Sequence, residues 1–162
     1  MGSHAAVSQV PAGMVAGNQR LVVLTGILGN GSHFDSQDKI RAIRELGEAH
    51  LISAVAAGML FNRANIQFED DPEVREVAAL NLRYVCEIRN RMAALRLARL
   101  TRIANEPEPA VRIGALRSLA TFQTAEAAAS VYDACNPLKE PDAKVREVAR
   151  DLIQKGLASS LY

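Results

Sequence analysis

The sequence predicts an all-α protein built from pairs of helices. A twelve-residue pattern occurs three times, at residues 71–82, 108–119 and 142–153, and each copy places apolar residues four positions apart. That spacing forms a stripe along one face of a helix. The copies begin 37 and then 34 residues apart, a period that accommodates two short helices with their turns. No segment of the chain shows a convincing strand pattern.

The three copies read DPEVREVAALNL, EPAVRIGALRSL and DAKVREVARDLI, and they share one frame. Each has a Val-Arg pair, an alanine four residues after the valine, and a leucine or isoleucine four residues further on. These positions are Val74, Ala78 and Leu82, then Val111, Ala115 and Leu119, then Val145, Ala149 and Ile153. Because alanine is small, we expect Ala78, Ala115 and Ala149 to lie where paired helices approach closely.

Acidic residues and a proline precede or open each copy, at residues 70–73, 106–109 and 140–142. Proline fits the first turn of a helix, where its missing N–H has no intrahelical partner to lose. Acidic side chains there complement the positive end of the helix dipole. Each copy therefore marks the start of a helix. The acidic run at 69–73 lacks the spacing of a calcium-binding loop and fits a helix start better.

A weaker copy precedes the three, in the stretch DSQDKIRAIRELGEAHL at 35–51. Two registers are open: one aligns Asp38, Ala42 and Leu46 with the later apolar positions, and the other aligns Ile40-Arg41 with Val-Arg. Segments with helical character lie between the marked helices. They predict second helices at 49–61, 88–104 and 124–135.

The N-terminal part gives a different kind of signal. Residues 1–4, Met1-Gly2-Ser3-His4, read as an expression scar, and residues 5–17 read as a flexible leader or an irregular cap on the first helix. The small residues after Ala5 suit either a linker or the start of an exported mature chain. Both a cytoplasmic and an exported location therefore stay open. We expect Asn18 to cap a helix that carries Leu21, Leu24 and Leu28. The glycine-rich stretch 29–31 would end it, since it lacks the following lysine that a phosphate-binding loop requires.

The pattern Asp/Glu-Pro-x-Val-Arg-x-x-Ala-x-x-x-Leu resembles that of HEAT repeats, including the armadillo-like and lyase-type variants, over residues 35–156. The resemblance implies a right-handed α-solenoid of about four HEAT-like helix pairs, near 35–66, 70–105, 106–138 and 140–162, in a single domain at 18–162. It also implies that the recurrent arginines, Arg75, Arg112 and Arg146, lie in the contact between repeats and pair with nearby acids or carbonyls.

Composition argues against several functional classes. The net charge is +1, aromatic residues make up 4% of the chain, and tryptophan is absent. Base-stacking sites and the tryptophan-dependent glycosylase chemistry of some HEAT-like proteins are therefore disfavoured. Cys86 and Cys135 are too few for a zinc site, and we expect two buried thiols rather than a disulfide. The longest apolar run, 51–61, is too short to span a membrane.

Histidines are also scarce. With no His-Glu dipeptide, the sequence lacks the iron ligands of HEAT-type hydroxylases, and we expect His50 to be a partly buried residue at a helix start. We accordingly expect no catalytic residue, no cofactor and no metal.

The candidate site is an arginine-rich helix face. The stretch from Arg83 to Arg102 contains six arginines and a single acidic residue, Glu87. A helical projection of 88–104 puts one set of residues on an apolar half: Ala93, Ala94, Leu97, Ala98, Leu100, Thr101 and Ala104. The other half carries Ile88 and Ile103 together with the candidate protein-binding residues. These candidates are Arg89, Arg91, Met92, Leu95, Arg96, Arg99 and Arg102. This mixture is typical of interface cores, and the alternative interpretation is an ordinary solvated helix face.

The sequence therefore favours a non-catalytic scaffold or adaptor whose partner is a protein with an acidic and apolar surface. A rival is a nucleic-acid-binding protein that contacts phosphates through the helix from Arg89 to Arg102, although the near-neutral net charge disfavours it. A third reading is an accessory to an enzyme, as in lyase-type HEAT proteins.

Overall fold

The computed structural model describes residues 12–29, 33–50 and 52–156, and these residues form eight α-helices and no strand. The all-α prediction is thereby confirmed. The helices are α1 (Ala12–Leu28), α2 (Ser36–Glu48), α3 (Ala54–Arg63), α4 (Pro72–Val85), α5 (Arg91–Leu100), α6 (Pro109–Leu119), α7 (Ala125–Asp133) and α8 (Ala143–Gln154).

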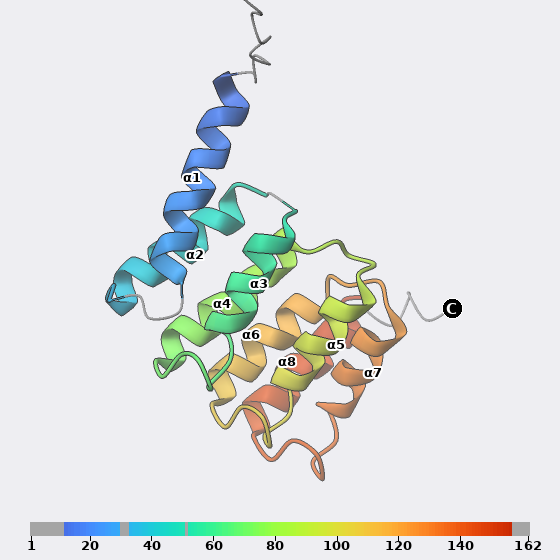
Figure 1. Cartoon of the computed structure of the whole chain (residues 1–162). Coiled ribbons are helices and arrows are strands. Elements are labelled where there is room, and N and C mark those ends of the chain that lie inside the picture. Colours follow the sequence, from blue (N-terminus) through green and yellow to red (C-terminus); the bar gives the residue numbers. More distant parts are fainter. Residues whose placement is uncertain (1–11, 30–32, 51, 157–162) are drawn as a thin grey trace, which may run out of the picture.

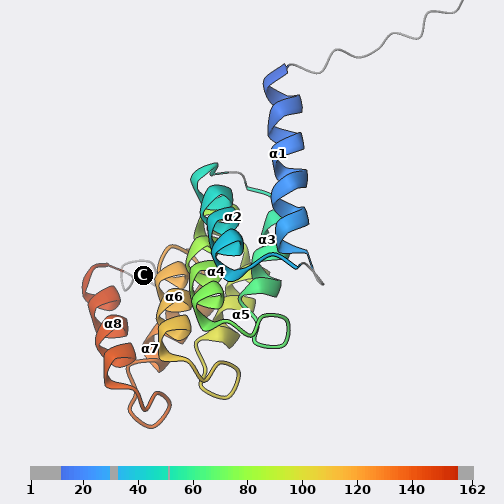
Figure 2. The same cartoon turned by 90° about the vertical axis from the view of Figure 1, so that its left-hand side faces the viewer.

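The helices that carry the repeated pattern stand side by side. α2 packs on α4, α4 on α6, and α6 on α8, while α3, α5 and α7 cover one side of this row (Figure 1). α5 and α7 also contact each other. α1 contacts α2 and α3, and its N-terminal part extends beyond the rest of the molecule (Figure 2).

Local sequence explains where most helices start. Pro72 and Pro109 occupy the first turns of α4 and α6. Six of the helices begin at a residue whose side chain accepts a hydrogen bond from a free backbone N–H of the first turn, which is the standard N-cap interaction. These caps are Asp35, Ser53, Asp71, Asn90, Thr124 and Asp142.

One hydrophobic cluster runs from α1 to α8. The repeated apolar positions lie in it except Ile153, which is partly buried and packs against it. Ala78, Ala115 and Ala149 are fully buried, which agrees with the predicted close approach of helices. α4 and α6 approach each other closely at Gly114. A Cβ atom there would lie 2.9 Å from the backbone oxygen of Glu76.

The second helices are shorter than predicted or shifted along the chain. The segment predicted at 88–104 forms a helix between Arg91 and Leu100, and the one predicted at 49–61 begins at Ala54. The reason is local chemistry. Asn90 and Ser53 take extended backbone angles and cap the first turns, and residues 101–105 form turns after α5.

The N-terminal predictions need correction. Residues 12–17, predicted to be flexible leader, belong to α1, so position 18 lies inside the helix and is not its cap. Residues 1–11 lie outside the described residues. Leu24 and Leu28 are buried and Leu21 is partly buried, as predicted. The predicted glycine terminus is described only at Gly29, which does not take a positive φ. Residues 30 and 31 lie outside the described part.

The structure selects one of the two registers of the first copy. Asp35 caps α2 as Asp71 caps α4, so Asp38, Ala42 and Leu46 align with the later apolar positions.

His50 does not start a helix, contrary to the prediction. It follows the end of α2, is exposed, has a φ of 47°, and meets the Tyr84 ring edge-on. Cys86 and Cys135 are free. Cys86 is buried as predicted, whereas Cys135 is only partly buried.

Candidate functional site

The outer face of α5 carries the predicted mixture of arginine and apolar side chains. Met92 is 66% exposed and Leu95 is 37% exposed, while the opposite side of the helix is buried. Arg89, Arg91, Arg96, Arg99 and Arg102 are all exposed. Ala104, predicted on the apolar half, is also exposed because the helix ends at Leu100, before that position.

Two of the candidate arginines are engaged by the neighbouring helix α7 and its N-terminal turn. Arg91 forms an ion pair with Glu126, and Arg89 lies 3.5 Å from the side-chain oxygen of Gln123. Hydrogen bonds from its own backbone N–H and from Arg91 lower the pKa of Glu126. Arg91 therefore joins α5 to α7, Arg89 joins the residues that precede these two helices, and both arginines are less available to a partner.

Arg96 has a different environment. Its guanidinium lies over the ring of Phe61, 3.9 Å from the ring centroid, in a cation–π contact between α5 and α3. Partial burial lowers the pKa of Arg96, Cys86 acts in the opposite direction, and the like charge of Arg99 lowers it further. Arginine still remains charged at neutral pH, so this position holds a fixed and partly desolvated cation.

Arg96 and Arg99 line a groove of about 380 Å³ between α5 and the end of α3. Phe61, Ile66 and Leu100 supply apolar lining, and the remaining lining residues are Asn65, Gln67, Ala104 and Asn105. Within the described residues, the Arg99 and Arg102 guanidinium groups have no hydrogen-bond or ion-pair partner. The groove thus combines two cations with an apolar wall, an arrangement that suits a carboxylate beside an apolar group.

The structure does not gather all the candidates at one place. Arg102 lines a neighbouring groove of about 360 Å³ with Ile103 and Lys139, and in that groove Lys139 is already paired with Asp133. Sequence reasoning missed Phe61 and Ile66 as lining residues of the α5 groove. Ile66 lies three residues before Glu69, as Ile103 lies three before Glu106, so the repeat alignment contained a signal for these exposed loop positions.

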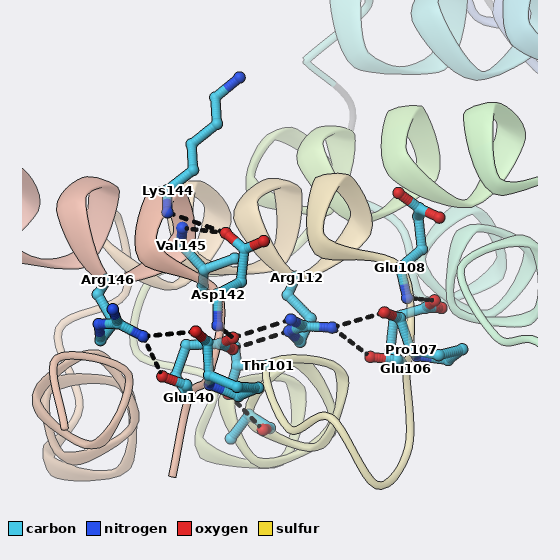
Figure 3. Close-up of polar contacts among 12 residues, drawn as sticks. Thr101, Glu106, Pro107, Glu108, Arg112, Glu140, Asp142, Lys144, Val145 and Arg146 are labelled. Carbon is cyan, nitrogen blue, oxygen red and sulfur yellow. Dashed lines mark hydrogen bonds and ion pairs between the residues drawn. The ribbon is translucent and has the colours of Figure 1, made fainter. Parts of the chain in front are cut away.

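A second set of charges lies inside the molecule and joins α4 to the loop before α6, and α6 to the loop before α8. Arg75 donates from Nε and Nη2 to Glu106, and Arg112 donates in the same way to Glu140. Figure 3 shows Arg112 between Glu140 and the loop that begins at Glu106. These contacts confirm the expectation that the recurrent arginines pair with acids or carbonyls. We refer to each such cation–carboxylate pair as a rung.

A related rung joins α2 to the loop before α4. Lys39 stands at the position of Arg75 and lies 2.9 Å from Glu69, and the same carboxylate oxygen accepts a bond from Arg63. From the sequence, Glu69, Glu106 and Glu140 are predicted only to be acidic residues near the starts of helices. Their recurrence two residues before each N-cap was the signal that they have a structural role.

Other kinds of site find no support among residues 12–29, 33–50 and 52–156. No group of three or more histidine, cysteine or acidic side chains is placed to hold a metal ion. None of the described helices is long and apolar enough to cross a membrane. Comparison of the chain with protein-family models, curated proteins and solved structures gave no match.

Proposed function

We propose that this protein is a HEAT-like, right-handed α-solenoid of about four helix pairs that acts by binding another protein and has no catalysis of its own. The binding surface is the α5 groove, defined by Phe61, Ile66, Arg96 and Arg99, together with the exposed Met92 and Leu95. Its partner presents a carboxylate next to an apolar side chain.

One observation carries this proposal. Arg96 and Arg99 face a groove with an apolar wall, whereas Arg91 of the same helix is neutralised by Glu126. A cation held over an aromatic ring is partly desolvated, and its attraction for an anion is stronger than that of a fully solvated charge. The exposed apolar side chains of α5 add area that a partner can cover.

Selection from a random peptide library tests the proposal without a known partner. We expect wild-type protein to enrich peptides that combine Asp or Glu with Leu, Ile or Phe. The double variant Arg96→Glu, Arg99→Glu should lose these peptides, because like charges across an interface cost several kcal/mol. Loss of the cation–π contact costs about 0.5–1 kcal/mol at an exposed site, so the variant should stay folded.

A matched control reverses two exposed charges in the other row of helices, Arg44→Glu with Arg117→Glu. This variant should retain the selected peptides. Equal enrichment by the α5 variant and the wild type would refute the α5 groove as the site.

A nucleic-acid partner would give a different salt dependence of binding and a different response to the Leu95→Ala variant. If the arginines bind phosphates, an oligonucleotide should bind with an affinity that falls steeply with salt, and Leu95→Ala should have little effect. For a protein partner we expect Leu95→Ala to weaken binding with little change in salt dependence.

A further inference from the structure

Among residues 12–29, 33–50 and 52–156, the arginine of α8 that matches Arg75 and Arg112 has no carboxylate partner. Arg146 stands at the position of Arg75 and Arg112, four residues after the N-cap of its helix. Arg75 and Arg112 are 4% and 1% exposed, and each holds a carboxylate from the following helix pair. In the part of the chain that the structure describes, neither Nε nor Nη2 of Arg146 has a hydrogen-bond partner.

The guanidinium of Arg146 is nevertheless held in the orientation of a rung. Its Nη1 donates to the backbone oxygens of Glu140 and Pro141, at 2.8 and 2.7 Å. Nη1 of Arg112 makes the same pair of bonds, to the backbone oxygens of Glu106 and Pro107 (Figure 3). In Arg112 this anchoring leaves Nε and Nη2 aligned on one carboxylate, so Arg146 presents the same two donors.

A second cation stands one turn along α8. Arg150 lies eight residues after the N-cap, where α4 and α6 carry Ala79 and Leu116. Those two side chains are fully buried, whereas Arg150 is exposed. The open edge of α8 therefore differs from the inner contacts, because it offers two arginines where α4 and α6 offer one arginine and one apolar side chain.

We infer that this α8 edge, Arg146 with Arg150, binds an acidic segment of another protein in which a glutamate stands two residues before a helix N-cap and a further acid lies nearby. This surface is separate from the α5 groove. The occupant follows from the inner rungs, where a glutamate at that position meets the equivalent cation each time. A bidentate carboxylate matches the free edge of the guanidinium.

A second copy of this chain, stacked end to end, does not fit. The equivalent position before α2, two residues ahead of Asp35, is His33, which has no carboxylate. The glutamates of the inner loops already accept bonds from their own rungs.

The test uses a peptide that copies residues 104–116, ANEPEPAVRIGAL, which carries two acids in the required arrangement. Arginine Nε–H signals of the whole protein are followed by NMR during titration. We expect the signal of Arg146 to shift and those of Arg75 and Arg112 to stay in place. The peptide with Glu106→Gln should bind about tenfold more weakly, the ratio that loss of one charged hydrogen-bonded pair gives.

Matched variants identify the surface. Arg146→Gln should abolish the binding, and Lys144→Gln, which removes one charge from the same helix, should not. Arg146→Lys keeps a donor for the loop oxygens and should bind more weakly than wild type. A peptide that leaves the Arg146 signal unmoved, or that binds Arg146→Gln as well as wild type, would overturn the inference. If binding is lost instead in Arg96→Glu, Arg99→Glu, the peptide occupies the α5 groove, and the inference fails while the proposed function stands.

Discussion

Arg112 of α6 and Glu140 of the loop before α8 form a buried bidentate ion pair, with Nε–Oε2 and Nη2–Oε1 both at 2.8 Å. The pair joins residues 28 positions apart in the chain. Arg112 also donates to two backbone oxygens of its own loop, and Glu140 accepts the backbone N–H of Asp142. One rung thus fixes the start of one helix against the next.

Removal of one member of this pair should destabilise the protein strongly. Arg112→Met leaves the Glu140 carboxylate buried without its counter-charge, and we expect a loss of about 3–5 kcal/mol. The matched control is Lys139→Met, which breaks an exposed pair with Asp133 and should cost no more than about 1 kcal/mol. Urea unfolding measures both variants, and equal losses would contradict a structural role for the rung.

A pair of glycine substitutions tests the close approach of α4 and α6. A Cβ at position 114 would lie 2.9 Å from a backbone oxygen of α4, which has little room to move. We expect Gly114→Ala to cost about 1–3 kcal/mol. At Gly58 in α3 no atom lies within 4 Å of the added Cβ, so Gly58→Ala should raise stability by roughly 0.5–1 kcal/mol. Opposite signs in thermal unfolding are the expected result.

The repeated alanine can be tested in the same way. Ala115 is fully buried, and Ala115→Leu should overpack the contact and cost about 1–3 kcal/mol. Ala129 is exposed on α7, so Ala129→Leu should change stability by less than about 0.5 kcal/mol. An unchanged melting temperature for Ala115→Leu would show that this helix face is not packed as described.

The two cysteines should differ in reactivity. Burial raises the pKa of Cys86 to about 11, so at pH 8 only about one molecule in a thousand carries the thiolate. Burial also raises the pKa of Cys135, although this side chain is only partly buried. We expect a thiol reagent to modify Cys135 first in native protein and both cysteines in urea. The variants Cys86→Ser and Cys135→Ser assign the two phases, and rapid native labelling of Cys135→Ser would contradict the burial of Cys86.

The cysteine pKa shifts also predict how stability depends on pH. A thiol that stays protonated in the folded state but ionises near pH 9 when unfolded favours folding below pH 9. This contribution is lost as the pH rises from about 9 towards 11. Replacement of Cys86 by serine should make the free energy of unfolding less dependent on pH in that range, as measured by urea unfolding at pH 8 and pH 10.

The sequence by itself determined the helices that carry the repeated pattern. α4, α6 and α8 begin within one residue of the predicted starts, because proline, the capping side chains and the apolar spacing act within one or two turns. The same local signals were weaker at the N-terminus. There the glycines and small residues of 12–17 suggested a leader, yet these residues continue α1.

The tertiary structure alone decided which acid each arginine meets and how deeply each pair is buried. Arg75, which belongs to the repeated pattern, is buried against Glu106, whereas Arg91 is exposed beside Glu126. These acids lie 31 and 35 residues away in the chain, and the sequence did not identify either of them as the partner. Arg96 and Phe61 likewise meet only because α5 packs near the end of α3. Helix formation follows from neighbours in the chain, whereas these contacts depend on the packing of separate helix pairs, which no local pattern specifies.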